Sequence, residues 1–230
     1  ARSEAASAAA HCERCCVQDF CAAECQDCDC YGVLKAQGFS LPLDLPAAFA
    51  ASGDFAMTRD LRWRDADLPG WTAVADAEIE LRESSFRGAG TGLFTKAALP
   101  AGAVIPPYAG RVLTFAEVNK SMHTPAAAYV WCPRGSRARI AEISAPGAAP
   151  VPWAGEPSFC VDARPLARQN PARYINGAKE LAQCEAVNVK FCELGQINYY
   201  RTTKAVPAGV ELVTDYGKKY WGARGLHGCD

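Results

Sequence analysis

The stretch Glu211-Leu-Val-Thr-Asp-Tyr-Gly217 decides how the rest of the chain is interpreted. Its apolar and β-branched residues predict a short strand over 210–214. Tyr216 follows directly, and Gly217 predicts a turn immediately after it. Taken alone, Tyr216 would be interpreted as a core aromatic residue of a β-strand. Two earlier stretches, around residues 88–92 and 173–179, give it a different meaning.

The first of these stretches is Arg87-Gly-Ala-Gly-Thr-Gly-Leu-Phe94, which follows a strand-like alternation of apolar and polar residues from Glu78. A glycine-rich turn after a strand also occurs in dinucleotide-binding folds, but there a helix must open directly behind it. Here further strand and turn residues follow, so the pattern predicts a glycine hairpin. Because glycine has no Cβ, its backbone could lie against a flat ligand. The alternative is a plain tight turn.

The second stretch is Asn170-Pro-Ala-Arg-Tyr-Ile-Asn-Gly-Ala178. An apolar pair flanked by Arg173 and Asn176 predicts a buried segment whose polar groups need partners, since unpaired buried polar groups are costly. The alternative is a helix N-terminus. Between the two stretches, Tyr129-Val-Trp131 predicts another strand, in which Tyr129 alone would be a core residue.

Twelve cysteines are unevenly distributed along the chain, and the first seven crowd into a single short segment: Cys12, Cys15, Cys16, Cys21, Cys25, Cys28 and Cys30. Their short spacings predict thiolate ligands of zinc. With His11 they could fill two tetrahedral sites or share one cluster. A disulfide framework is the alternative, disfavoured because seven is odd and two cysteines are adjacent. The other five are expected to be small buried residues or free thiols: Cys132, Cys160, Cys184, Cys192 and Cys229.

Length and composition limit the remaining possibilities. The 230 residues, half of them hydrophobic, suffice for one ordinary domain and a small module. No apolar run reaches the roughly 18–20 residues of a membrane helix, so no membrane partner is expected. A net charge of −1 argues against general nucleic-acid binding but allows a basic peptide partner. Nothing indicates an oligomer, and a monomer is predicted.

In their order and separation, these segments resemble the SET domain, the β-rich fold of protein lysine methyltransferases, over roughly residues 77–221. Arg173-Tyr-Ile-Asn-Gly-Ala-Lys179 resembles the family motif R-[FY]-[IV]-N-H-[SC], with Gly177 where a histidine is usual. The PR-domain branch, with R-Y-V-N-C-A-R, also lacks that histidine. The resemblance implies a mainly β fold, the β-clip, of small sheets and few short helices. It also implies a last segment that threads beneath a preceding loop in a knot-like arrangement.

The resemblance further implies transfer of methyl groups from S-adenosylmethionine to a protein lysine, with a histone tail as substrate and the nucleus as location. Tyr216 and Tyr129 would be the catalytic residues. In the absence of the three-cysteine zinc tail that some SET enzymes carry, Trp221 would cover the adenine. The cofactor-binding residues would be Gly90, Thr91, Gly92, Leu93, Tyr129, Arg173, Asn176, Gly177, Tyr216 and Trp221. Two alternatives remain: a methyltransferase acting on a non-histone protein, and a degenerate, partner-binding module, which Gly177 favours.

The expected organisation of the chain has five parts. Residues 1–10 form a disordered lead, 11–31 a cysteine-rich zinc-binding segment, and 32–76 a linker that packs on the main domain and carries a short helix near Pro46–Ala51. Residues 77–221 form the SET domain, and 222–230 a tail. Within the domain, the capping box Thr114-Phe-Ala-Glu117 predicts a helix from Thr114 to about Met122, and Arg134–Ser158 is expected to form a long loop.

Overall fold

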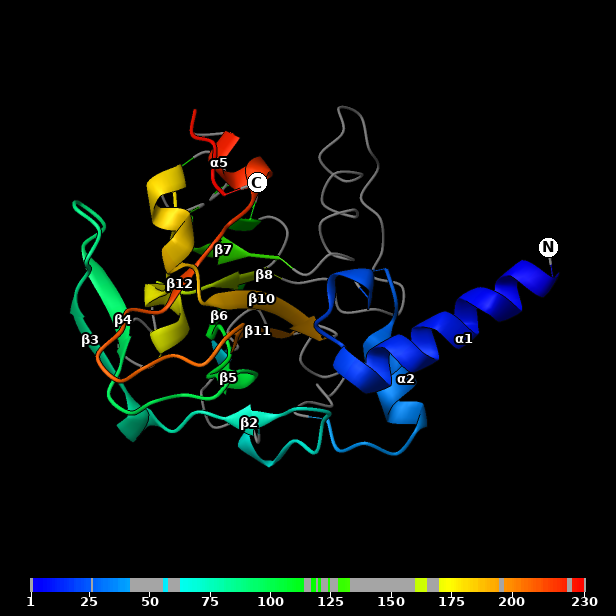
Figure 1. Cartoon of the computed structure of the whole chain (residues 1–230). Helices are drawn as coiled ribbons and strands as arrows, with labels where there is room; N and C mark the ends of the chain where they lie inside the picture. Colours follow the sequence, from blue (N-terminus) through cyan, green and yellow to red (C-terminus); the bar gives the residue numbers. More distant parts are fainter. Residues whose placement is uncertain are drawn as a thin grey trace.

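The computed structural model describes residues 2–25, 27–41, 56–57, 63–113, 117–118, 120, 124, 128–132, 160–164, 170–194, 197–222 and 225–229. The predicted helix near Pro46–Ala51 and the predicted loop Arg134–Ser158 lie outside the described residues, as does most of the predicted helix from Thr114 to Met122. Small sheets and short helices make up the described part (Figure 1). The predicted mainly β fold of small sheets is confirmed.

One four-stranded sheet forms the centre, in the order β10–β11–β5–β2. Its strands are β2 (Thr72–Ala73), β5 (Ala103–Ile105), β10 (Val189–Leu194) and β11 (Ile197–Thr202). β10 and β11 form an antiparallel pair, and β5 joins β11 antiparallel and β2 parallel. Because β2 lies within the predicted linker, the sheet begins earlier in the chain than residue 77.

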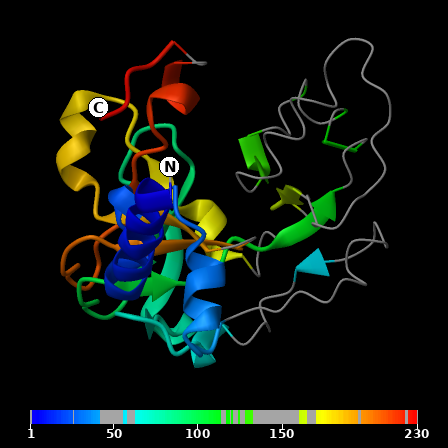
Figure 2. The same ribbon diagram turned by 90° about the vertical axis from the view of Figure 1, so that its right-hand side faces the viewer.

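A second sheet has the order β1–β6–β8–β7 and is drawn on one side of the molecule in Figure 2. Its residues Trp131 and Val161 share a hydrophobic core with Tyr199 of the central sheet. It consists of β1 (Ala56–Met57), β6 (Gly110–Leu113), β7 (Val130–Trp131) and β8 (Cys160–Asp162). β6 pairs antiparallel with both β1 and β8, and β7 pairs antiparallel with β8. The strand predicted at Tyr129–Trp131 is therefore confirmed over Val130–Trp131.

Two two-stranded sheets carry the motifs singled out in the sequence. β3 (Ile79–Glu83) and β4 (Thr91–Thr95) form the predicted glycine hairpin. Gly88 and Gly90 have φ values of +76° and +75° in its turn, a conformation that favours glycine. β12 (Val213–Thr214) pairs parallel with β9 (Asn176–Gly177), which brings the last strand beside the second motif.

Short helices connect these sheets, and one follows the last strand. They are η3 (Trp63–Asp65), η4 (Asp76–Glu78), η7 (Pro171–Tyr174), η8 (Leu181–Ala186) and α5 (Lys218–Gly222). One hydrophobic core joins the glycine hairpin, the β9 segment and the last strand. It includes Leu93, Ile105, Ile175, Val189 and Leu212. Among the described residues no helix is long and apolar enough to cross a membrane.

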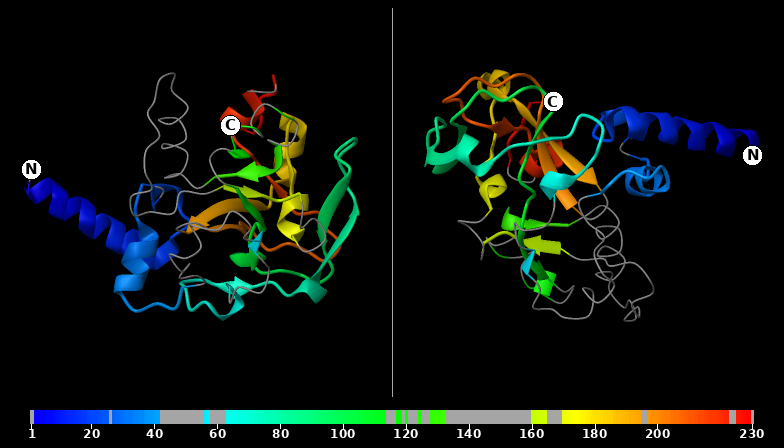
Figure 3. Two further views of the ribbon diagram at one scale, coloured as in Figure 1. Left: turned by 180° about the vertical axis from the view of Figure 1, so that it is seen from behind. Right: turned by 90° about the horizontal axis from the view of Figure 1, so that it is seen from below.

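The N-terminal residues form a helical cap made of α1 (Arg2–Asp19), η1 (Ala23–Cys25) and α2 (Cys30–Ala36). The N-terminal half of α1 projects from the body of the molecule (Figures 1 and 3). The structure thus differs from the predicted disordered lead over residues 1–10. The reason is composition: alanine has the highest helix propensity, and this segment is rich in it.

Ion pairs and aromatic contacts dock the helical cap on the central sheet. Asp19 lies 2.7 Å from Nη1 of Arg201 on β11 and 3.3 Å from Nζ of Lys190 on β10. Burial raises the pKa of the Asp19 carboxyl, but a hydrogen bond from the Cys21 amide and the two positive charges outweigh it and hold the pKa below its usual value. The Phe20 ring packs 6.1 Å from that of Trp71.

The predicted zinc segment is wrong, because all seven of its cysteines are in disulfides. Three bonds staple the cap internally: Cys12–Cys28, Cys15–Cys25 and Cys16–Cys30. The seventh cysteine, Cys21, reaches Cys192 on β10, across 171 residues. The odd count that argued against disulfides is explained by this distant partner, and a bonded sulfur is no longer a thiolate ligand. No group of three or more potential metal ligands gathers in the part of the chain that the structure describes.

The prediction for the scattered cysteines also needs correction. Cys132 pairs with Cys160, which links β8 to the residue after β7, and Cys184 pairs with Cys229. Together with Cys192, all five therefore belong to disulfides rather than to free thiols. Single cysteines carry no sequence signal of their partners, because pairing depends on which strands the fold brings together.

Candidate active site around Tyr216

The last strand is fixed from two sides, and this places the residues of the site. On one side the Leu212 amide donates to the Leu93 carbonyl at 2.7 Å, and the Thr95 amide donates to the Val210 carbonyl at 3.0 Å. On the other side β12 runs beside β9, and the Ala178 amide donates to the Thr214 carbonyl at 2.8 Å. The glycine hairpin and the 173–178 segment, far apart in sequence, therefore meet at residues 211–216.

Glu211 is the polar centre of this meeting point, with only 5 % of its surface exposed. Its carboxylate accepts hydrogen bonds from Ser84 Oγ at 2.7 Å, from the amide and hydroxyl of Ser85, and from Asn176 Nδ2 at 3.0 Å. Burial raises the pKa of Glu211, but these donors outweigh it and hold the pKa below its usual value. Glu211 is thus an ionised anchor that binds the hairpin turn to β9.

Asn176 connects the two ligand-binding motifs that the sequence predicted. Besides Glu211, its Nδ2 donates to the Thr91 carbonyl at 3.2 Å, at the start of β4. A Cβ at Gly92 would lie 2.8 Å from the Glu211 carboxyl carbon, so only glycine fits at this position of β4, against the Glu211 side chain. Leu93 is a core residue with 1 % exposure, and its contribution to the site is its backbone.

Tyr216 donates its hydroxyl proton to the Ile175 carbonyl at 2.6 Å. Its ring packs against Tyr220 and Trp221 of α5, with ring centroids 4.6 and 5.4 Å away. A Cβ at Gly177 would lie 2.5 Å from Cε2 of Tyr216 and 2.6 Å from Cζ2 of Trp221. These rings occupy the space that a side chain would need, which explains glycine where the family motif has histidine.

Three further tyrosines lie near Tyr216: Tyr108, Tyr200 and Tyr220. The sequence did not predict them as site residues. Burial raises the pKa of Tyr200 well above its usual value, and its electrostatic neighbours are Tyr216, Tyr108 and Tyr220. Burial likewise raises the pKa of Tyr108. The phenols of Tyr108 and Tyr200 are therefore neutral at physiological pH. The available signal was strand position, since Tyr200 on β11 pairs with Ile105 on β5, but alternation alone could not tell a site tyrosine from a core one.

Tyr129 and Arg173 lie at the edge of this aromatic group. The Arg173 guanidinium stacks 4.7 Å from the Tyr129 ring centroid and 5.1 Å from that of Tyr174. Its Nη1 donates to the Ala163 carbonyl at 3.0 Å, so the side chain braces the end of β8. Tyr108 donates to the Tyr129 carbonyl at 3.1 Å, which links the edge to the centre. Tyr129 is 38 % exposed and could contact a bound partner.

The chemistry of these residues fits the cofactor that the resemblance implies. S-adenosylmethionine carries a sulfonium cation, and cations bind favourably to aromatic faces and near carboxylates. The site supplies the half-buried rings of Tyr216 and Tyr220 as aromatic faces, with Trp221 packed behind them, and Glu211 as a carboxylate. Gly90 offers further access, because a Cβ there would meet nothing within 4 Å. The residues that could hold the cofactor are the Gly90–Leu93 backbone, Asn176, Gly177, Tyr216 and Trp221.

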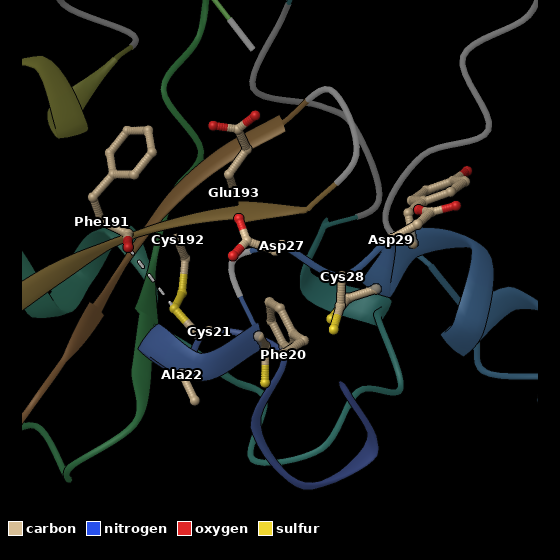
Figure 4. Close-up of a pocket in the computed structure, with 12 residues that line it drawn as sticks. Phe20, Cys21, Ala22, Asp27, Cys28, Asp29, Phe191, Cys192 and Glu193 are labelled. Carbon is tan, nitrogen blue, oxygen red and sulfur yellow. Dashed lines mark hydrogen bonds between the residues drawn. A yellow bond between two sulfur atoms is a disulfide. The ribbon is translucent and has the colours of Figure 1, made fainter. Parts of the chain in front are cut away.

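A cavity of about 400 Å³ lies elsewhere, between the helical cap and β10 (Figure 4). Phe20, Cys28 and Asp27 line it from the cap, and Cys192 and Glu193 from β10. None of the predicted catalytic or cofactor residues borders it. A second cavity of about 230 Å³ borders Ser85, Glu211 and Val213.

Comparison with known proteins gives a family and several relatives. A family model described as the SET domain matches residues 90–217, more than half of the chain. The human histone-lysine N-methyltransferase PRDM16 is 26 % identical over 192 residues, which cover 75 % of this chain and 13 % of that protein. The chain thus spans only a small part of this relative's length.

Solved structures show a weaker likeness. The methyltransferase domain of human PR domain-containing protein 2 has a TM-score of 0.42 and 21 % identity, covering 62 % of this chain and 79 % of that one. The ATXR5 SET domain in complex with histone H3 has a TM-score of 0.41 and 17 % identity, covering 60 % and 57 %. Likeness at this level carries no conclusion about activity or substrate.

Proposed function

The chain belongs to the SET-domain family, and from that premise we propose that it transfers methyl groups from S-adenosylmethionine to the ε-amine of a protein lysine. One observation carries the proposal: the glycine hairpin, the Asn176–Gly177 strand and Tyr216 converge on one aromatic, carboxylate-anchored site.

The methyl acceptor must be a neutral amine before it can attack. A free lysine has a pKa of about 10.4, so neutralising it at pH 7 costs roughly 4–5 kcal/mol. Aromatic walls formed by buried Tyr200 and half-buried Tyr108 and Tyr216 disfavour the ammonium ion by desolvation. The bound cofactor supplies an electrophilic methyl group and a positive charge that disfavours the ammonium further.

Tyr216 acts by positioning. Its proton is directed at the Ile175 carbonyl, so its oxygen is oriented to accept a hydrogen bond from the substrate amine. Tyr108 and Tyr200 stay protonated because burial raises the pKa of each. Tyr129, exposed at the edge, borders the entrance for the lysine side chain. Their combined contribution is alignment and electrostatic stabilisation rather than proton transfer.

A histone tail is the proposed substrate, and the nucleus the proposed location, because the curated relative is named a histone-lysine N-methyltransferase. The six disulfides argue in the other direction, since they are typical of oxidising compartments and rare in nuclear proteins. A non-histone substrate is therefore a real second candidate, supported by this specific observation. Imaging the tagged full-length protein in its own cells separates the two locations.

A partner-binding module without activity is the third candidate, and Gly177 no longer favours it. The space of the missing histidine side chain is filled by Tyr216 and Trp221, so the glycine belongs to a complete packing arrangement. If the folded wild-type chain bound no S-adenosylmethionine, the inactive partner-binding module would become the favoured candidate.

The test is transfer of a labelled methyl group from S-adenosylmethionine to a histone mixture and, in parallel, to a lysate protein mixture. We expect label on lysine with the wild-type chain and a loss of about 100-fold or more with Tyr216→Phe. The matched control is Tyr31→Phe, which makes the same change in the helical cap, remote from the site, and should retain activity. Equal labelling by both variants would contradict the role of Tyr216.

A further inference from the structure

Trp221 is held between two glycines that belong to different parts of the chain. A Cβ at Gly177 on β9 would lie 2.6 Å from Cζ2 of the indole, and a Cβ at Gly228 in the tail would lie 2.5 Å from Cδ1. Gly228 also has a φ of +70°, which favours glycine. The indole is 6 % exposed as a result. The tail therefore forms one wall of the slot that fixes Trp221.

Asp215 connects this tail to the last strand. Its Oδ1 accepts from the Gly217 amide at 2.9 Å and from the indole Nε1 of Trp221 at 3.1 Å. Its Oδ2 accepts from the Cys229 amide at 3.3 Å. One carboxylate thus orients the turn after Tyr216, the indole and the end of the tail.

A disulfide closes the same arrangement covalently. Cys229 is bonded to Cys184 of η8, with the two Cα atoms 5.4 Å apart. η8 follows β9 closely in sequence, so the bond returns the tail to the segment that carries Gly177. The backbone of residues 225–229 is tied to α5 by two hydrogen bonds, from Gly225 to Gly222 and from Leu226 to Trp221.

We propose that the Cys184–Cys229 disulfide is a positioning device that keeps Trp221 and Tyr216 in place beside Gly177. Loss of the bond releases the tail, and with it the wall and the Cys229–Asp215 hydrogen bond that hold the indole. The aromatic side of the cofactor site is then formed only in the crosslinked chain. The link to the cofactor rests on the proposed function, whereas the positioning of Trp221 does not.

The test compares Cys184→Ala/Cys229→Ala with the control Cys12→Ala/Cys28→Ala, in which a disulfide between half-buried cysteines of the distant helical cap is removed. Hydrogen exchange is measured on the chain without ligand. We expect the amides of Trp221 and Leu226 to exchange about tenfold faster or more in the first variant only. Slow exchange of the β10 and β11 amides in the same experiment shows that each variant is folded.

Calorimetry with S-adenosylmethionine supplies the second readout, with affinity reduced about tenfold or more in the first variant and unchanged in the control. Unchanged exchange at Trp221 and Leu226 would overturn the positioning role, as would free thiols at Cys184 and Cys229 in the native protein. If the wild-type chain binds no S-adenosylmethionine, the proposed function fails, and the exchange data still decide whether the disulfide positions Trp221.

Discussion

Replacing Gly177 by alanine tests whether β9, Tyr216 and Trp221 form one fitted site. Gly177 does not have a positive φ, so alanine can adopt its backbone conformation and the effect is purely steric. The new Cβ would lie 2.5 Å from Cε2 of Tyr216 and 2.6 Å from Cζ2 of Trp221. Ordinary carbon contacts need about 3.5–4.0 Å, so the rings must move by roughly 1 Å.

The size of the effect follows from that displacement. Overpacking of this kind costs about 1–3 kcal/mol of stability. A shift of about 1 Å in a catalytic group can lower turnover about 100-fold. The matched control is Gly222→Ala at the end of α5, where a Cβ would meet nothing within 4 Å. At such a compatible site alanine is neutral or stabilises by up to about 1 kcal/mol.

Urea unfolding followed by circular dichroism gives the stability change, and the methyl-transfer assay gives the turnover. We expect Gly177→Ala to lower both the unfolding free energy and the turnover, and Gly222→Ala to lower neither. If Gly177→Ala were as stable and as active as Gly222→Ala, the fitted arrangement of Gly177, Tyr216 and Trp221 would not exist in solution.

Two further predictions concern the Glu211 anchor of the site and the disulfide between the helical cap and β10. Glu211→Gln should cost about 1.5–3 kcal/mol near pH 7, because a carboxylate that accepts several hydrogen bonds is lost. The folded pKa of Glu211 lies below its unfolded value, so the stability that its carboxylate contributes is present above the unfolded pKa and is lost as pH falls through the folded pKa. The difference in unfolding free energy between wild type and Glu211→Gln should therefore shrink on acidification. A difference that stays constant with pH would refute the ionised anchor. Cys21→Ala/Cys192→Ala removes a crosslink across 171 residues and should lower stability by about 3–5 kcal/mol in urea titrations. Alkylation of the unreduced, unfolded wild-type protein should add no mass, whereas bound zinc with free thiolates would give several additions.

The sequence predicted the glycine hairpin and the last strand of the site, because their signals are local, but it did not predict that Asn176–Gly177 is a strand. Alternation at Ile79 and Leu81, and glycines at 88 and 90, are enough to define the β3–β4 hairpin. The pairing of β12 with β9 could not be derived in this way, because parallel neighbours far apart in sequence leave no periodic trace. The family resemblance supplied that proximity, through Asn176 and Tyr216.

The cysteines show where spacing misleads. Short C-x2-C and C-x3-C gaps are compatible with zinc and with disulfides between neighbouring helices. In the helical cap, disulfides join α1 to η1 and to the start of α2. The odd number of clustered cysteines was no argument against disulfides, because Cys21 pairs with Cys192, outside its cluster. Tyr108 and Tyr200 were missed for a related reason: a buried tyrosine in or beside a strand has the same sequence signature whether it faces a core or a site.

Binding of S-adenosylmethionine, measured by calorimetry, tests the central claim most directly. The account predicts saturable binding to the purified, oxidised wild-type chain. Asn176→Ala should weaken it about tenfold or more, because Asn176 joins the Thr91 carbonyl to Glu211. Tyr31→Phe should leave it unchanged. No binding to a wild-type chain whose folding is confirmed by circular dichroism would contradict the proposed enzyme and would favour a partner-binding module.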